Sequence, residues 1–156
     1  MEDDLTYKLV SQHLELDGLL FGLDDKFLHH KIDGKWSISE IIAHLGRYQE
    51  IFSKRLELML NMNCHFLNRY IAENDMDFAK WCNKDLKTIV RDLKTDREKI
   101  IHMLSILSSS ELERLGEHPT LGKMAIKDWI TFFLYHESHH LYQIFRLKNQ
   151  MKNYIE

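Results

Sequence analysis

The stretch Trp129–Lys148, WITFFLYHESHHLYQIFRLK, decides the fold and places two histidines on one side of a helix. Apolar residues recur every three or four positions along it, which is typical of an amphipathic helix. His136 and His140 fall on the same inward stripe as Phe133 and Ile144. Side chains four residues apart on a helix are neighbours, with Cβ atoms roughly 5–6 Å apart. The two imidazoles can therefore reach one metal ion.

Length and composition indicate one helical domain. The chain has 156 residues, of which 44% are apolar and 29% charged, with one proline and six glycines. So few helix breakers favour an all-α fold, and the length suits a single domain over residues 1–156. The formal charge of −3 and the lack of a basic stripe argue against nucleic-acid binding. We expect a cytoplasmic protein with no membrane span, because the sequence lacks a signal-peptide pattern and a long apolar run.

Three further amphipathic segments indicate a four-helix bundle. Apolar spacing predicts helices over residues 3–22, 37–60 and 84–107, and the last helix is predicted to begin near residue 125. Ser37 and Glu40 fit a capping box at the start of the second helix. Asn83 is a suitable N-cap for the third helix.

The connections between these helices are predicted to be mostly irregular. Residues 24–36 are expected to form a loop with solvated histidines. The connection 61–83 is longer than most loops, so we expect a short helical piece around residues 65–72. Its length lets the chain cross the bundle, so that the second and third helices can run parallel. Residues 108–125 are predicted to form a helical turn capped by Ser110 and Glu113, followed by a loop.

A third candidate metal ligand, His44, lies on the inward stripe of the second helix. Metal sites in bundles are built from side chains that project inward from facing helices. Three neutral imidazoles suit a divalent metal, with Zn²⁺ or Ni²⁺ as the first candidates and Fe²⁺, Co²⁺ or Mn²⁺ as alternatives. Three protein ligands leave an open position, which is typical of a catalytic site. That position can hold a water nucleophile or a thiolate.

The segment from His136 to His140 also matches HExxH, the pattern of zincin metalloproteases. Those enzymes take a third ligand downstream, but the sixteen residues after His140 contain no histidine, and their only acidic residue is Glu156. A protease is therefore disfavoured. His139 is offset from the inward face, so the ligands are expected to be the pair spaced four residues apart.

Four other side chains are candidates for the site. Glu137 lies one step from the stripe, where it is a candidate base or a group that orients a ligand, with a surface carboxylate as the alternative. Tyr48 and Gln143 are candidates for contacts with the substrate or with the metal ligands. Arg97 interrupts the apolar stripe of the third helix. It either snorkels at the edge of that face or lines a polar pocket and receives an anionic substrate group.

Two segments resemble the DinB/YfiT-like superfamily, and most closely its YfiT-like branch. They are KWSISEIIAHLGRY around His44 and HPTLGKMAIKDWITFFLYHESHHLYQI around His136 and His140. The resemblance implies a single DinB-like domain in an up-down-down-up four-helix bundle, with a long crossover between helices two and three. It also implies a divalent metal on these three histidines and frequent homodimers. Members of the superfamily include metal-dependent hydrolases and thiol-dependent S-transferases and isomerases.

The sequence thus predicts a metal-dependent enzyme that acts on a small molecule. The reaction is either hydrolysis or S-transfer with a low-molecular-weight thiol. The alternative is a non-catalytic metal-binding or stress-response module, and a test of turnover separates the two.

Overall fold

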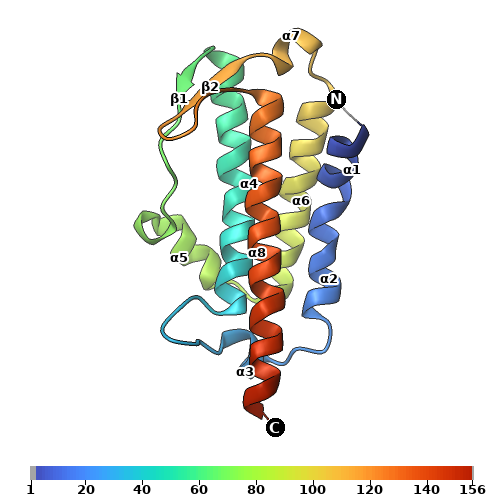
Figure 1. Ribbon diagram of the computed structural model, residues 1–156, viewed down its shortest axis with the longest axis vertical. Coiled ribbons are helices and arrows are strands. Elements are labelled where there is room, and N and C mark those ends of the chain that lie inside the picture. Colours follow the sequence, from blue (N-terminus) through green and yellow to red (C-terminus); the bar gives the residue numbers. More distant parts are fainter. Residues whose placement is uncertain (1–2, 156) are drawn as a thin grey trace.

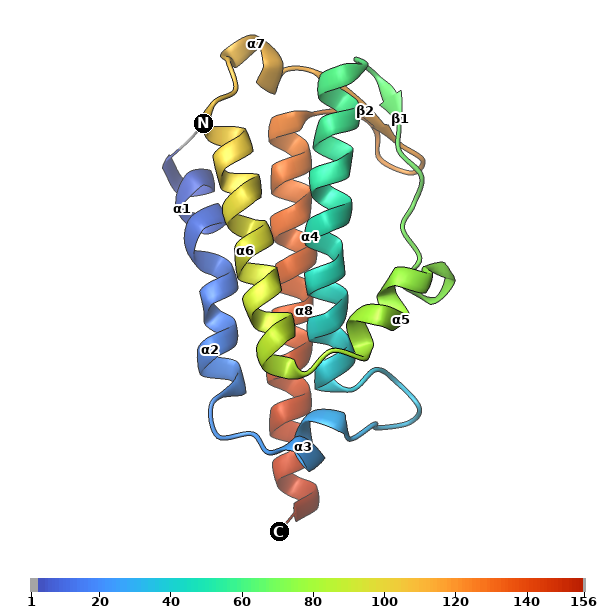
Figure 2. The same ribbon diagram turned by 180° about the vertical axis from the view of Figure 1, so that it is seen from behind.

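The computed structural model describes residues 3–155, and four long helical segments form its body (Figures 1 and 2). The first segment consists of α1 (Asp3–Ser11), a 3-10 turn (Gln12–Leu14) and α2 (Glu15–Leu20); the others are α4 (Ile38–Asn61), α6 (Leu86–Ser105) and α8 (Ile126–Ile155). In Figure 1, α4 and α6 run in one direction, and the first segment and α8 run in the other. This is the predicted all-α bundle in up-down-down-up order.

The helix starts follow short-range capping rules. The Ser37 side chain accepts a hydrogen bond from the Glu40 backbone, and the Glu40 carboxylate accepts one from the Ser37 backbone, as predicted. For α6 the predicted N-cap was wrong: Asp85 caps this helix, whereas Asn83 ends the preceding helix. Asn83 and Asp85 are both suitable caps, and local propensity does not choose between them.

The capping box of the short helix α7 (Ser109–Leu112) also differs from the prediction. It is formed by Ser108 and Glu111, two residues before the predicted pair. The 24–36 connection contains a short helix, α3 (Asp25–His29), and the histidines there are exposed, as expected.

The long crossover does connect α4 with α6, but it begins as a strand. The predicted helical piece at residues 65–72 is wrong, because β1 (His65–Phe66) pairs in parallel with β2 (Leu115–His118), which pairs in turn with β3 (Gly122–Ala125). The crossover then continues through a 3-10 turn (Ala72–Asn74) to α5 (Met76–Cys82). Strand pairing across some fifty residues is non-local, so helical periodicity gives no signal for it.

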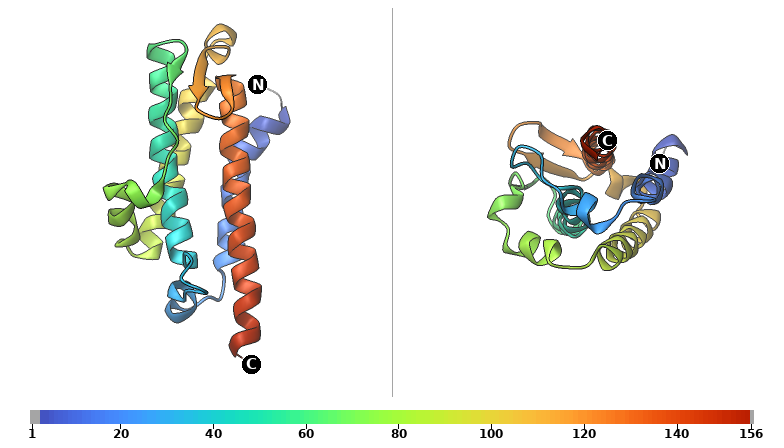
Figure 3. Two further views of the ribbon diagram at one scale, coloured as in Figure 1. Left: turned by 60° about the vertical axis from the view of Figure 1, so that its left-hand side comes forward. Right: turned by 90° about the horizontal axis from the view of Figure 1, so that it is seen from below.

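The small sheet lies close against the bundle, and glycine permits this approach. Gly116 lies in β2. A Cβ at this position would lie 2.5 Å from Met59 Sδ and 2.9 Å from Trp129 Nε1. Figure 3 shows the sheet and α5 on one side of the bundle, with α1 and α2 on the other.

The core has two apolar clusters stacked along the bundle. One cluster includes Phe52, Leu56, Met59, Ile100, Trp129 and Phe133, and the other includes Leu16, Ile41, Leu45, Trp81, Leu93 and Ile144. His44, His136 and His140 lie where the two clusters meet. In the described part of the chain, no helix is both long and apolar enough to cross a lipid bilayer.

The contact between α4 and α5 depends on Gly46. A Cβ at this position would lie 2.3 Å from the Trp81 ring, which is 3% exposed. We predict that Gly46→Ala lowers the free energy of unfolding by about 1–3 kcal/mol, because the added methyl group overpacks this contact. The matched control is Gly18→Ala in α2, where a Cβ meets nothing within 4 Å. Urea unfolding of both variants tests this contact, and equal stabilities would contradict it.

Candidate metal centre

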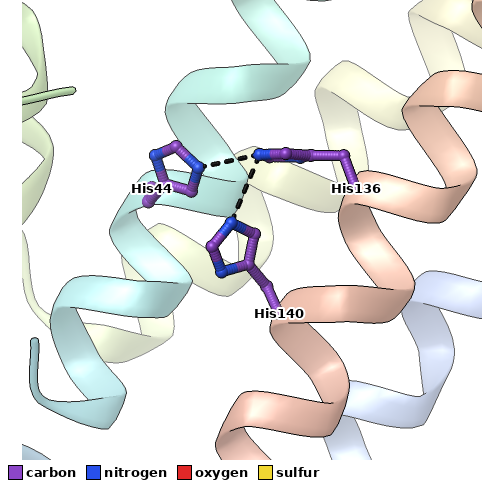
Figure 4. Close-up of side chains that lie close together, drawn as sticks. All are labelled: His44, His136 and His140. Carbon is purple, nitrogen blue, oxygen red and sulfur yellow. Dashed lines mark hydrogen bonds between the residues drawn. The ribbon is translucent and has the colours of Figure 1, made fainter. Parts of the chain in front are cut away.

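Three histidines from two helices converge between the apolar clusters. His44 projects from α4, and His136 and His140 project from successive turns of α8 (Figure 4). The His136 Nε2 atom lies 3.0 Å from His44 Nε2 and 3.2 Å from His140 Nε2. One ring nitrogen from each histidine lies within 4.8 Å of the others. The structure therefore brings together the three side chains that the sequence predicts as ligands.

The spacing of these nitrogens fits one metal ion. Metal–nitrogen bonds of about 2.0–2.1 Å at tetrahedral angles hold ligand nitrogens roughly 3.3 Å apart. His140 Nδ1 lies 3.0 Å from Gln143 Oε1. Because that oxygen can only accept, the Nδ1 atom carries the proton and the Nε2 atom carries the lone pair. Gln143 thus holds His140 in the tautomer that a metal ion requires.

Burial keeps the three imidazoles neutral. It lowers the pKa of His44 to about 3 and that of His136 to about 2, and the neighbouring histidines add to both effects. Burial also lowers the pKa of His140 to about 4, against the opposing effect of its hydrogen bond to Gln143. Neutral imidazole is the form that binds metals, so these side chains need not lose a proton at neutral pH.

Aromatic rings form the walls around the histidines. The Tyr48 ring stacks on His136 with a centroid distance of 3.9 Å, and its hydroxyl accepts a hydrogen bond from Arg55. Trp36 lies 4.9 Å from His44 between ring centroids, and Tyr70 stacks on the same histidine at 5.7 Å. Tyr48 therefore packs against a candidate ligand, and its role at the site stays a prediction. Trp36 and Tyr70 come from connections, where helical periodicity gives no signal.

The histidines line a cavity of about 550 Å³. Residues 69–73 of the crossover and the β2–β3 hairpin form its other side. The cavity gives a small molecule access to the three imidazoles.

Glu137 and Arg97 form a buried ion pair that is separate from this cavity. Their side chains are 2% and 0% exposed, and Arg97 Nη2 donates to Glu137 Oε1. Arg97 also donates to Gln49 Oε1 at 3.0 Å and to the Leu9 carbonyl at 2.9 Å, while Gln12 donates to Glu137 at 2.8 Å.

These contacts correct the roles expected for both residues. Arg97 neither snorkels nor receives a substrate group, because no part of its side chain is exposed. Glu137 is not a surface carboxylate, and its hydrogen bonds go to Arg97 and Gln12 rather than to an imidazole. One helical step is a rotation of roughly 100°, so Glu137 leaves α8 on a different face from His136. The geometry therefore favours a structural role for Glu137 over that of a base.

The model of the DinB superfamily matches residues 9–144 of the chain. The protein belongs to the DinB superfamily. The match begins in the last turn of α1 and continues to Ile144 in α8, so all three histidines lie within the matched region.

Two curated relatives and one solved structure extend the comparison. YuaE of Bacillus subtilis, an uncharacterized protein, is 25% identical over 155 residues, covering 89% of this chain and 94% of its own length. A protein of Oceanobacillus iheyensis named "Putative metal-dependent hydrolase" is 23% identical over 117 residues, covering 72% of this chain and 64% of its own length. The structure of YfiT from Bacillus subtilis is similar with a TM-score of 0.83 and 19% identity, covering 96% of this chain and 87% of that one. YfiT is described as "a probable metal-dependent hydrolase with an unusual four-helix bundle topology", and at this identity the likeness shows the fold.

The buried pair of this DinB protein gives a stability prediction. Glu137→Ala leaves the Arg97 guanidinium buried without its carboxylate, so we predict a loss of about 3–5 kcal/mol in the free energy of unfolding. The control is Glu57→Ala, because the Glu57 side chain is 46% exposed and its contact with Lys54 is a surface pair. That variant is expected to stay within about 0.5 kcal/mol of wild type. If Glu137→Ala unfolds like wild type but loses activity, Glu137 is a catalytic group instead.

Proposed function

We propose that His44, His136 and His140 bind one divalent metal ion, and that the protein uses it to hydrolyse a small molecule. Zn²⁺ and Ni²⁺ are the first candidates for the ion, and Fe²⁺, Co²⁺ and Mn²⁺ are the alternatives. The observation that carries the proposal is the convergence of three neutral imidazole nitrogens on the wall of an accessible cavity. Hydrolysis is preferred because a curated relative and the structural neighbour YfiT both carry that description.

The ion would supply Lewis acidity and lower the pKa of a water molecule in the cavity. The chain supplies the positioning. Gln143 fixes the ring of His140 through its hydrogen bond, and Tyr48 holds the ring of His136 by stacking. Trp36 and Tyr70 cover His44 and shield it from bulk solvent. A site whose supporting contacts are already formed needs little rearrangement when its ion binds.

Metal content tests the ligand set. Wild-type protein purified from metal-supplemented cells should contain about one ion per chain, as expected for a single three-histidine site. We predict that His44→Ala, His136→Ala and His140→Ala each abolish this content in elemental analysis. Gln143→Leu should retain the site but weaken affinity about 10–100-fold, because it removes only the group that orients His140.

His139 provides the matched control for this measurement. It lies on the same turn of α8, but it is exposed and outside the group of converging nitrogens. His139→Ala should therefore bind metal like wild type. Equal, near-zero metal in wild type and His136→Ala would contradict the proposed site.

Turnover tests the reaction. Metal-loaded wild type is expected to hydrolyse at least one member of a panel of small esters, amides and phosphoesters. The activity should disappear on chelation, return when metal is added back, and persist in His139→Ala. Turnover that requires an added low-molecular-weight thiol would indicate S-transfer instead of hydrolysis. A metal-loaded protein that is inert in both assays would point to the non-catalytic module.

A further inference from the structure

The cavity beside the three histidines carries positive charge that the proposed metal site does not explain. Arg55 of α4, Arg69 of the crossover and His118 at the end of β2 all line it. Within residues 3–155, neither arginine has a carboxylate within 4.0 Å, the limit for an ion pair. The only acidic residue among the lining side chains is Glu73, which is exposed.

Arg55 is the notable member, because it is only 6% exposed. Its Nη1 atom donates to the Tyr48 hydroxyl at 2.9 Å, and its Nη2 atom donates to the Asn68 carbonyl at 2.8 Å. Its guanidinium also lies over the rings of Tyr48 and Trp129, 5.7 Å and 5.4 Å from their centroids. These neutral groups orient the cation but do not neutralise it, and they leave further N–H donors of the guanidinium unused.

Arg97, the other buried arginine of the described chain, differs from Arg55 because it is paired with Glu137. Buried charges in proteins are usually paired, because an isolated ion loses its hydration without compensation. An unpaired, buried guanidinium on the wall of a cavity therefore indicates that the partner is an anionic ligand.

His118 adds a neutral donor at the same end of the cavity. Its Nδ1 atom accepts hydrogen bonds from the backbone N–H groups of Thr120 and Leu121, each at 3.2 Å. Partial burial and the charges of Arg55 and Arg69 lower the pKa of His118. The ring is therefore neutral with its proton on Nε2, and that N–H can donate to an anion.

One side chain connects the positively charged end of the cavity to the histidines. Tyr48 contacts both groups, since its ring stacks on His136 and its hydroxyl bonds to Arg55. The positively charged end is thus one tyrosine ring away from the candidate metal centre. A small molecule can place an anionic group there while another part of it reaches the imidazoles.

We propose that Arg55, Arg69 and His118 bind an oxyanion, a carboxylate or a phosphate, that belongs to the substrate. This names the substrate class of the proposed hydrolase, and in that respect it rests on the proposed function. The binding of the anion itself requires no metal, so the two proposals can be tested separately.

The test is an NMR titration of the full-length protein at low ionic strength, with butyrate and inorganic phosphate in separate arms. The signals to follow are the indole N–H groups of Trp36 and Trp129 and the backbone amides of Arg69 and His118. The titration is run on wild type and on His136→Ala. Binding at the arginines should persist in His136→Ala, whereas an anion held by a metal ion should be lost there.

Charge variants locate the site. Arg69→Gln is expected to weaken binding about tenfold, because one charge-assisted hydrogen bond is lost. Arg146→Gln is the matched control, since Arg146 is exposed and does not line the cavity. Arg55→Lys keeps the charge but loses the planar fork, so it should also weaken binding, with circular dichroism confirming the fold.

The outcomes are distinct. Tighter binding of butyrate would identify a carboxylate, and tighter binding of phosphate would identify a phosphate. If neither anion shifts the wild-type signals at millimolar concentration, or if Arg69→Gln and Arg55→Lys bind like wild type, the oxyanion site is overturned. If the protein failed to bind metal in the tests of the proposed function, the outcome of the anion titration would stay the same.

Discussion

The convergence of three imidazole nitrogens between α4 and α8 is the constraint on which the site depends. Polar groups that are buried and face one another are costly unless something satisfies them. The His136 Nε2 atom faces the Nε2 atoms of both His44 and His140 and can share at most one proton with them, so the site is under-satisfied within the protein itself. The bundle nevertheless holds it in place with aromatic stacking and one amide contact. An arrangement that costs stability and faces a cavity is better explained by a ligand than by packing.

Two adjoining faces of α8 carry different polar groups. One face carries His136 and His140 toward the cavity, and the adjoining face carries Glu137 to Arg97. The buried ion pair links α8 to α6, and the further bonds of Arg97 and Glu137 reach α4 and the first helical segment. Through these contacts the pair holds the rotation of α8, and the rotation of α8 sets where the two histidines point. The pair is therefore linked to the site through the orientation of the helix rather than through contact with a reacting group.

Sequence periodicity predicted the parts of the structure that depend on local rules. It gave the four helices, the capping box at Ser37 and the inward face shared by His136 and His140. It also selected His44, because facing helices of a bundle must bring their stripes together. It did not give the β-sheet, the roles of Arg97 and Glu137, or the positively charged end of the cavity. Those features depend on which distant segments meet, as when Arg69 of the crossover and His118 of the hairpin reach the same cavity.

X-ray absorption spectroscopy of the metal-loaded protein tests the central claim most directly. The account predicts three imidazole nitrogens at about 2.0–2.1 Å around a Zn²⁺ ion, with an additional light atom in the open position. His44→Ala, which is expected not to retain the ion, should lose this signal, whereas His139→Ala should leave the spectrum unchanged. A wild-type spectrum with fewer than three imidazoles, or one that is unaffected by the loss of His44, would contradict the account.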